Sequence, residues 1–280
     1  MLRHRYAVVI AAVTVGAVAL TGCSSSGNKG GSGGSGGTGL KTLVVGVNVP
    51  YSPNEFLDSN NKVIGFDVDL LDAVAKQAGY KTEYRQADFD KIVPAVAGGT
   101  YDIGMSSFTD NKQREQTVDF VDYFSAGYLW ASPTGKTVDP NNACGLTVAV
   151  QSTTTEQTDQ LPALSKACTS AGKPAIKVLS YKSQDDATNA VVLGKADAMS
   201  ADSPVTAYAI KQSGGKLQQA GDITEAAPYG WPIKKGSPLV QQIQSALQTL
   251  MSNGTYDTIC KKWGVESGEI KSPVINGATS

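Results

Sequence analysis

The sequence predicts an α/β protein made of two successive units, each with a mainly parallel sheet flanked by helices. From Leu40 onward, short β-rich runs alternate with segments of helical periodicity, and the same alternation starts again near Cys144. Because a strand, a helix and another strand in succession form a parallel pair with a crossover helix, each unit is expected to build its own parallel sheet. A chain of 280 residues is long enough for two such units.

The first unit contains three expected strands and two expected helices. The strands are KTLVVGVNV (41–49), KTEYRQ (81–86) and YDIGMSS (101–107). The first helix, GFDVDLLDAVAKQAG (65–79), places its apolar residues on one face and ends at Gly79. The second, DFDKIVPAVAGG (88–99), is expected to begin at Asp90 as N-cap.

The second unit repeats the pattern. Strands are expected in residues 145–151, 175–181 and 195–202, and helices in residues 152–161, 183–194 and 203–215. Thr153 and Glu156 have the spacing of a capping box at the first of these helices, and Ser183 and Gly194 bracket the second. A further amphipathic helix is expected in residues 237–254, and the chain from Lys271 onward is expected to be flexible.

The first 39 residues have the composition of an export signal followed by a tether. A basic start, MLRHR, precedes 15 mainly apolar residues and then LTGC, which resembles the bacterial lipobox with Cys23 as the lipidated residue. The apolar stretch is short for a membrane span, and an uncleaved anchor helix is the alternative. The Gly/Ser-rich segment 24–39 is typical of a flexible linker. We therefore expect an extracytoplasmic domain that is lipid-anchored to the cell membrane.

Composition and charge fit a soluble globular domain and argue against nucleic-acid binding. Hydrophobic residues make up 41% of the chain and charged residues 18%, with a formal charge of −1. Removal of residues 1–22 would leave 22 Lys and Arg against 25 Asp and Glu, a charge of −3. This balance does not supply the basic face that phosphate binding requires.

Export determines how the cysteines are interpreted. If Cys23 carries lipid, three cysteines remain, and outside the cytoplasm two of them can pair. We favour a Cys144–Cys168 disulfide, because Cys260 lies at helical spacing with Tyr256 and Trp263 and is expected to be a buried thiol. The cysteines are too scattered for a zinc site, and the mature chain has no histidine. We therefore expect no metal and no cofactor.

Several segments resemble one protein family in order and spacing. GFDVDLLDAVAKQAG, DFDKIVPAVAGGTYDIGMSSFT, REQTVDFVDYF, ADAMSADSPVTAY and NGTYDTICKKWG are similar to the amino-acid-binding family (family 3) of bacterial extracellular solute-binding proteins. The resemblance covers residues 40 to about 264. It implies a two-lobed periplasmic-binding-protein-like fold (type II), in which two hinge strands join the lobes and a small ligand is delivered to an ABC importer.

The resemblance also implies domain boundaries, with hinge crossings near 123–127 and 226–230. The expected segments are a signal peptide (1–22), a lipidated cysteine with its tether (23–39), the first part of lobe 1 (40–125), lobe 2 (126–226), the C-terminal part of lobe 1 (227–270) and a flexible tail (271–280).

The polar loop MSSFTDNKQR (105–114) has the chemistry of a carboxylate receptor. Burying an amino acid's charges is costly unless each meets a partner, and a guanidinium offers a planar fork of donors that matches a carboxylate. The resemblance places Arg114 on the ligand α-carboxylate, with further donors from Thr109 and from the amides around Ser107. The alternative is that these residues cap a helix starting near Asn111.

The resemblance assigns further ligand contacts outside this loop. Asp202 ends a strand, where open α/β sheets place ligand groups, and would accept the α-ammonium; a surface turn residue is the alternative. Tyr51 and Phe89 resemble the aromatic residues that enclose the ligand, and each could instead be a core residue. Thr155 lies at a helix start, where it could serve either a cap or the ligand carboxylate.

Ligand identity is less well determined by the sequence. Family members that bind cationic side chains commonly have an acidic residue where this chain has Asn48. Asn48 and Gln151, together with Glu156, favour a polar ligand, with glutamine or asparagine ahead of glutamate. The expected partners are this amino acid and the permease subunits of the importer, and the protein is expected to be monomeric.

Two other functions use the same fold. The protein could be a sensor that presents its loaded state to a membrane receptor or kinase. It could also be an enzyme, since the fold resembles exported dehydratases that act on amino-acid-like substrates. Acid–base catalysis would then depend on carboxyl groups, and no nucleophile–base pair is evident in the sequence. We therefore expect a binding protein and no catalytic residues.

Overall fold

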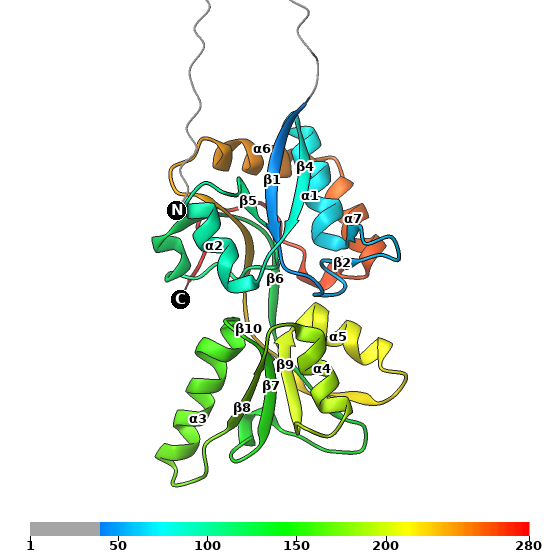
Figure 1. The fold of residues 1–280 in the computed structure, drawn as a ribbon, viewed down its shortest axis with the longest axis vertical. Helices are drawn as coiled ribbons and strands as arrows, with labels where there is room; N and C mark the ends of the chain where they lie inside the picture. The colour runs from blue at the N-terminus through cyan, green and yellow to red at the C-terminus, as the bar shows by residue number, and fades with distance from the viewer. Residues whose placement is uncertain (1–39, 280) are drawn as a thin grey trace, which may run out of the picture. The chain divides into compact units, whose positions relative to one another are not determined.

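Two long neighbouring strands, β6 (Val118–Pro133) and β10 (Leu217–Lys234), organise the fold. The computed structural model describes residues 40–279. β6 and β10 pair antiparallel from Lys234 with Val118 at one end to Leu217 with Pro133 at the other. Each strand runs through both lobes of the described unit (Figure 1).

Lobe 1 contains the beginning and the end of the described chain. Its strands are β1 (Lys41–Val47), β4 (Tyr80–Gln86) and β5 (Ile103–Gly104), and β1 pairs parallel with both of the others. Its helices are α1 (Phe66–Gln77), α2 (Phe89–Ala97), α6 (Leu239–Ser252) and α7 (Thr255–Trp263). A small ribbon of β2 (Phe56–Leu57) and β3 (Val63–Ile64) precedes α1. The predicted apolar face of α1 is buried in the core of this lobe.

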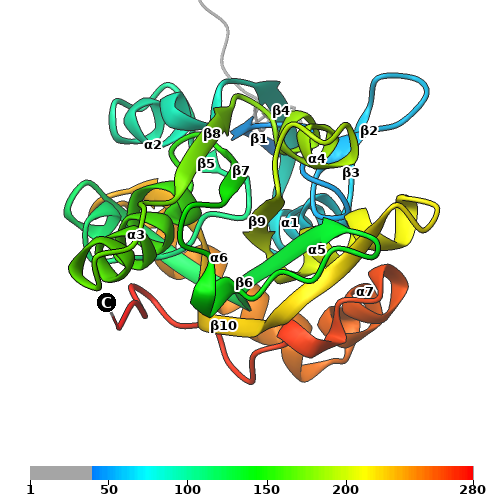
Figure 2. The same cartoon turned by 90° about the horizontal axis from the view of Figure 1, so that it is seen from below.

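Lobe 2 is a second parallel sheet with helices on both faces. Its strands are β7 (Thr147–Gln151), β8 (Lys177–Tyr181) and β9 (Ala198–Asp202), and its helices are α3 (Leu161–Ser170), α4 (Gln184–Val192) and α5 (Ser203–Gln212). Side chains of α3 pack with Val148 and Val150, whereas α4 and α5 pack with Ala149 on the opposite face of β7. Figure 2 shows α3 on one side of this sheet and α4 and α5 on the other.

The shared strands join both lobes into one hydrogen-bonded sheet in the order β4-β1-β5-β10-β6-β9-β7-β8. The β6–β10 ladder shifts register between Thr224 and Ala227 and again between Tyr229 and Gly230. At Gly127 the two strands approach so closely that an added Cβ would lie 2.4 Å from the Thr224 carbonyl oxygen. A further shift lies between Ala220 and Thr224. Gly127 and the shift at Tyr229 fall in the segments where the hinge crossings are expected, and the lobe boundaries themselves stay a prediction.

The secondary-structure predictions need three local corrections. The strand expected over residues 101–107 is only Ile103–Gly104. Helix α2 begins two residues earlier than predicted, with Asp88 rather than Asp90 at the N-cap, because Asp88 is the last extended residue. The capping box at Thr153 is absent. Thr153 has a left-handed φ of 64°, and its N–H donates to Gln157 Oε1 while a π-helical turn (Glu156–Gln160) leads into α3.

The C-terminal segment is ordered against β6, so the prediction of a flexible tail from residue 271 is wrong for residues 271–279. Ile275 pairs with Val121, and the Asn276 side chain accepts the Phe120 N–H. The Gly277 N–H donates to Asp122 Oδ2 at 3.1 Å. The segment is held because carboxylates of lobe 1 supply acceptors for its backbone amides.

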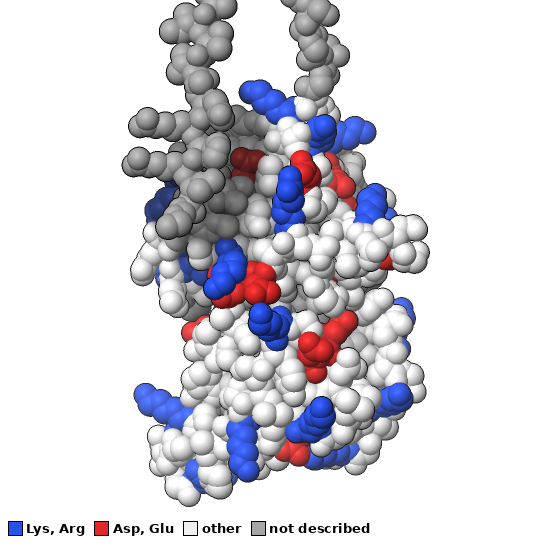
Figure 3. Space-filling model, viewed as in Figure 1, with Lys and Arg blue, Asp and Glu red and all other residues white. Residues whose placement is uncertain are grey.

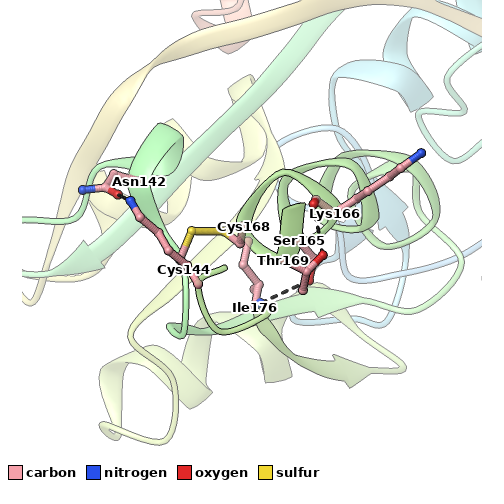
Figure 4. The surroundings of a disulfide bond; sticks show 8 residues. Asn142, Cys144, Ser165, Lys166, Cys168, Thr169 and Ile176 are labelled. Carbon is pink, nitrogen blue, oxygen red and sulfur yellow. Dashed lines mark hydrogen bonds between the residues drawn. A yellow bond between two sulfur atoms is a disulfide. The ribbon is translucent and has the colours of Figure 1, made fainter. Parts of the chain in front are cut away.

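The predicted Cys144–Cys168 disulfide is present and ties the start of β7 to α3, with 5.5 Å between the Cα atoms (Figure 4). The nearby Ile176 N–H donates to Ser165 Oγ, which fixes the segment before β8 to the same helix. Cys260 is a buried free thiol in α7, as expected from its helical spacing.

The surface view agrees with the balanced charge of the sequence. Basic and acidic side chains are interspersed over the face shown in Figure 3, and both signs meet at the waist between the lobes. Within residues 40–279, no helix combines the length and the hydrophobicity needed to cross a membrane. The predicted signal segment and Cys23 lie outside the described residues.

Candidate functional site

A small polar pocket lies between the lobes, close to the carboxyl ends of β1, β7 and β9. It is lined by Tyr51, Phe89, Ser106, Ser107, Thr109, Arg114, Thr154, Thr155, Glu156 and Asp202. Parallel sheets collect ligand groups at this end of their strands, so the location fits a binding site. The pocket brings together every predicted ligand residue except Asn48 and Gln151.

Arg114 is held in place by aromatic rings and by both lobes. Its guanidinium lies 5.7 Å from the ring centroid of Phe89 and 5.4 Å from that of Phe108, and these two rings stack on each other. Nη1 donates to the Thr109 carbonyl at 2.8 Å, and Nη2 donates to the Thr153 carbonyl of lobe 2 at 3.4 Å. Since a guanidinium has five N–H groups, donors remain for a ligand carboxylate.

The local turn around Arg114 is capped by another residue. Asn111 Oδ1 accepts the Arg114 N–H at 2.8 Å, at the start of a short 3₁₀ turn (Arg114–Gln116). Capping therefore does occur in this loop, but through the Asn111 side chain and the Arg114 backbone. The Arg114 side chain remains available to the pocket.

The loop that carries Ser106 and Ser107 is held in place by two buried carboxyl groups of lobe 1. Ser107 has a left-handed φ of 50°, and its N–H donates to Asp67 Oδ2. The Ser106 and Ser107 hydroxyls both donate to Glu55, each at 3.1 Å. Asn54 Nδ2 also donates to Ser107 Oγ. The Ser107 hydroxyl therefore points into lobe 1, although the residue lines the pocket as predicted.

Asp202 reaches the pocket from lobe 2 and contacts lobe 1. It is the last residue of β9, is 7% exposed, and accepts the Tyr51 hydroxyl at 2.6 Å through Oδ2. Burial raises its pKa to about 6, while the Tyr51 hydrogen bond and Arg114 lower it in part. Asp202 is thus the acceptor of a hydrogen bond between the lobes and is not a surface turn residue.

Ser106, Thr154 and Glu156 also line the pocket; of these, only Glu156 entered the sequence-based prediction, as an indication of a polar ligand and not as a ligand contact. Ser106 is adjacent to Ser107, so the predicted loop could have included it. Thr154 and Glu156 belong to the segment STTTE, which was interpreted as a helix cap. Its backbone departs from a helix start at Thr153, and both side chains line the pocket. The position of this segment also indicates a ligand site, because it directly follows a buried strand of lobe 2 and parallel sheets bind ligands at the carboxyl ends of their strands.

Asn48 and Gln151 contact each other across the cleft. Gln151 Nε2 donates to Asn48 Oδ1 at 2.8 Å, and Asn48 Nδ2 donates to the Ala87 carbonyl. At the mouth of the cleft, the exposed Lys182 and Asp88 side chains approach to 3.3 Å. Both contacts join the lobes, so the described conformation is closed around the pocket.

The closed pocket is small. It encloses about 10 Å³, which is room for about one water molecule. A free amino acid is much larger, so the lobes must separate for one to enter. Within residues 40–279, no three His, Cys, Asp or Glu side chains are grouped as metal ligands.

Comparisons with known proteins agree on the type of fold. The sequence profile described as bacterial extracellular solute-binding proteins, family 3, matches residues 43–266. The arginine-binding protein ArgT of Corynebacterium glutamicum is 43% identical over 236 residues, which cover 84% of this chain and 78% of the relative.

Two solved structures have the same architecture. An ancestral arginine-binding protein bound to arginine superposes with a TM-score of 0.72 at 32% identity, over 79% of this chain and 97% of the other. An ancestral amino acid-binding protein, a precursor of cyclohexadienyl dehydratase, gives a TM-score of 0.67 at 33% identity, over 79% of this chain and 94% of the other.

Proposed function

The chain belongs to the bacterial extracellular solute-binding proteins, family 3, and on that premise we propose that it captures one free amino acid outside the cytoplasm and delivers it to an ABC importer. One observation carries the proposal. A guanidinium held by lobe 1 and a carboxyl group held by lobe 2, Arg114 and Asp202, line the same pocket. This is the charge pattern that complements an α-carboxylate and an α-ammonium.

The two anchors couple binding to closure. Taking the charges of an amino acid out of water is costly unless each finds a partner with good geometry. Arg114 would bind the carboxylate with its remaining donors, and Asp202 would accept the ammonium. Because the anchors come from different lobes, the ligand satisfies both only when the lobes close. The 10 Å³ cavity of the closed form supports an open form for ligand entry.

We infer that the ligand is a cationic amino acid such as arginine. The prediction of glutamine or asparagine relied on Asn48 and Gln151 together with Glu156, and in the structure the two amides hydrogen bond to each other. The relative from Corynebacterium glutamicum and the ancestral protein are both arginine-binding proteins. Glutamine is the second candidate, since it shares the α-groups that Arg114 and Asp202 would bind.

A binding experiment tests the proposed function. We expect isothermal titration of the domain 40–280 against the twenty amino acids to give one site per chain, with arginine the tightest ligand. Scattering at saturating ligand should show a more compact particle, and ligand should raise the Tm by mass action. If no free amino acid binds, the proposed function is wrong. Mass spectrometry of recovered ligand should show it unchanged; a converted product would favour the dehydratase-like alternative.

We also propose that Cys23 carries the lipid that anchors the domain to the cell membrane. The basic and apolar segments followed by LTGC support this. Cys23→Ala is expected to release the protein from the membrane fraction, because two lipid chains provide stable anchoring and the Gly/Ser tether provides none. A Ser24→Ala variant is the matched control. Retention of Cys23→Ala at the membrane with Met1 still present would indicate an uncleaved anchor helix.

A further inference from the structure

The pocket contains one more carboxyl group than the α-groups of an amino acid require. Among the described lining residues, Arg114 is the one cation, whereas Asp202 and Glu156 are both acidic. A zwitterionic ligand with a neutral side chain would pair with Arg114 and Asp202 and leave Glu156 without a positive partner. A buried carboxyl group without a positive partner keeps its proton, whereas a ligand that brings a second positive charge can pair with the ionised form of Glu156.

Glu156 has the geometry of an unused acceptor. It is 1% exposed, and its Oε1 atom has no hydrogen-bond partner within residues 40–279. Glu156 is the first residue of the π-helical turn in lobe 2, and it lines the pocket together with side chains of lobe 1. Buried carboxyl oxygens are nearly always hydrogen bonded, and Glu156 lines the pocket, where a ligand can supply the donor.

We propose that Glu156 determines the ligand class by accepting hydrogen bonds from the positively charged side chain of the ligand, with a guanidinium as the best fit. A guanidinium can donate two parallel hydrogen bonds to a carboxylate, which an ammonium or amide cannot reproduce. The inference rests on the proposed function, because it assumes that Arg114 and Asp202 bind the α-groups. It adds that Glu156 recognises the side chain of the ligand.

The surroundings of Glu156 make this recognition depend on pH. Burial and Asp202 raise its pKa to about 8, while its own amide, the Thr154 hydroxyl and Arg114 lower it in part. The charged and titratable groups that face it are Arg114, Asp202, Tyr51 and Tyr128. At pH 7 Glu156 is therefore mostly protonated without ligand. A guanidinium requires the carboxylate, so binding of arginine must expel this proton.

A comparison of the affinities for arginine and citrulline distinguishes ligand recognition by Glu156 from a purely structural role of this residue. Citrulline has the same α-groups and nearly the same shape as arginine, but its side chain is neutral. We expect Glu156→Gln to weaken arginine binding by about 10- to 150-fold, the usual range for a charge-assisted hydrogen bond. Citrulline binding should change little. Asp159→Asn is the matched control, since it removes an exposed carboxylate from the same helical turn.

The outcomes have different meanings. If the wild type binds no free amino acid, the proposed function fails. If it binds another amino acid but not arginine, the function stands and the inference is overturned. If the wild type binds arginine and Glu156→Gln binds it equally well, the inference is overturned and the function stands. If Glu156→Gln weakens arginine and citrulline equally, or lowers the Tm without ligand, Glu156 is a structural residue of the helix start, and the inference is again overturned.

Proton release gives an independent readout. Calorimetry at pH 7 in buffers of different ionisation enthalpy should show that arginine releases close to one proton on binding to the wild type, whereas citrulline releases almost none. The ratio of arginine to citrulline affinity should rise about fivefold between pH 7 and pH 8, because the ionised fraction of a group with a pKa of about 8 rises from about one tenth to about one half. Glu156→Gln should abolish both effects; equal proton release with both ligands would contradict the inference.

Discussion

Replacement of Arg114 by alanine is expected to weaken amino-acid binding by about 30-fold to several thousand-fold. The substitution would leave the ligand carboxylate in the closed pocket without its main partner, and removal of one member of such a buried pair typically costs about 2 to 5 kcal/mol. It would also remove the Nη2 hydrogen bond to the Thr153 carbonyl, one of the contacts between the lobes. Isothermal titration with arginine measures the loss.

Two companion variants show whether the guanidinium itself is responsible. Arg114→Lys keeps the charge but loses the planar fork and its packing over the two phenylalanine rings, so it should recover only part of the affinity. Lys112→Ala removes an exposed charge of the same loop, which pairs with Glu115, and should bind normally. A lower Tm without ligand and unchanged affinity in Arg114→Ala would mean that the loop residues only cap the turn.

The sequence allowed the architecture to be predicted because its periodicities are local and strong. The apolar stripe of α1, the Ser183 cap and the stop at Gly194 each follow from residues within one turn of the element. The prediction failed where distant residues decide the structure. The tail is ordered by carboxylates more than 150 positions earlier, as in the contact between Gly277 and Asp122, and no local pattern reveals such partners.

The same distinction explains what was predicted of the site. Arg114, Asp202 and Tyr51 could be predicted to share one pocket because they resemble matching positions in a known family, and they do line the same pocket. Asn48 hydrogen bonds to Gln151, 103 residues away, a contact that no local pattern reveals; its contact with the ligand stays a prediction. Glu156 was interpreted as a cap because its spacing from Thr153 fits one. The left-handed backbone at Thr153, which turns the segment into the pocket, could not be read from that spacing.

Replacement of Asp202 by asparagine is expected to weaken binding by about 30-fold to several thousand-fold and, at the same time, to stabilise the ligand-free protein. The ammonium would lose its charged acceptor in a buried site, at a typical cost of about 2 to 5 kcal/mol. The amide oxygen of asparagine can still accept the Tyr51 hydroxyl, so the contact between the lobes is kept. Titration with arginine and a thermal melt without ligand measure the two effects.

The expected gain in stability follows from the sign of the pKa shift. The pKa of Asp202 in the folded protein is raised to about 6, above its ordinary value of 3.8, chiefly because the group is buried. As pH rises from about 4 to 6, Asp202 loses its proton in the unfolded chain but keeps it in the folded protein. The folded state therefore loses stability relative to the unfolded one over this range. Asparagine cannot ionise, so the Tm of the Asp202→Asn variant at pH 7 should exceed that of the wild type.

Ligand binding should depend on pH in the opposite sense. Ammonium binding requires the ionised carboxylate, so wild-type affinity should fall as pH drops below about 6, and this fall should be absent in Asp202→Asn. Asp222→Asn, which removes an exposed charge from β10, should match the wild type in affinity, Tm and pH profile. A lower Tm with retained affinity in Asp202→Asn would show that Asp202 serves only the fold. A higher Tm with lost affinity would show that the protein keeps an unfavourable buried charge because its ligand needs it.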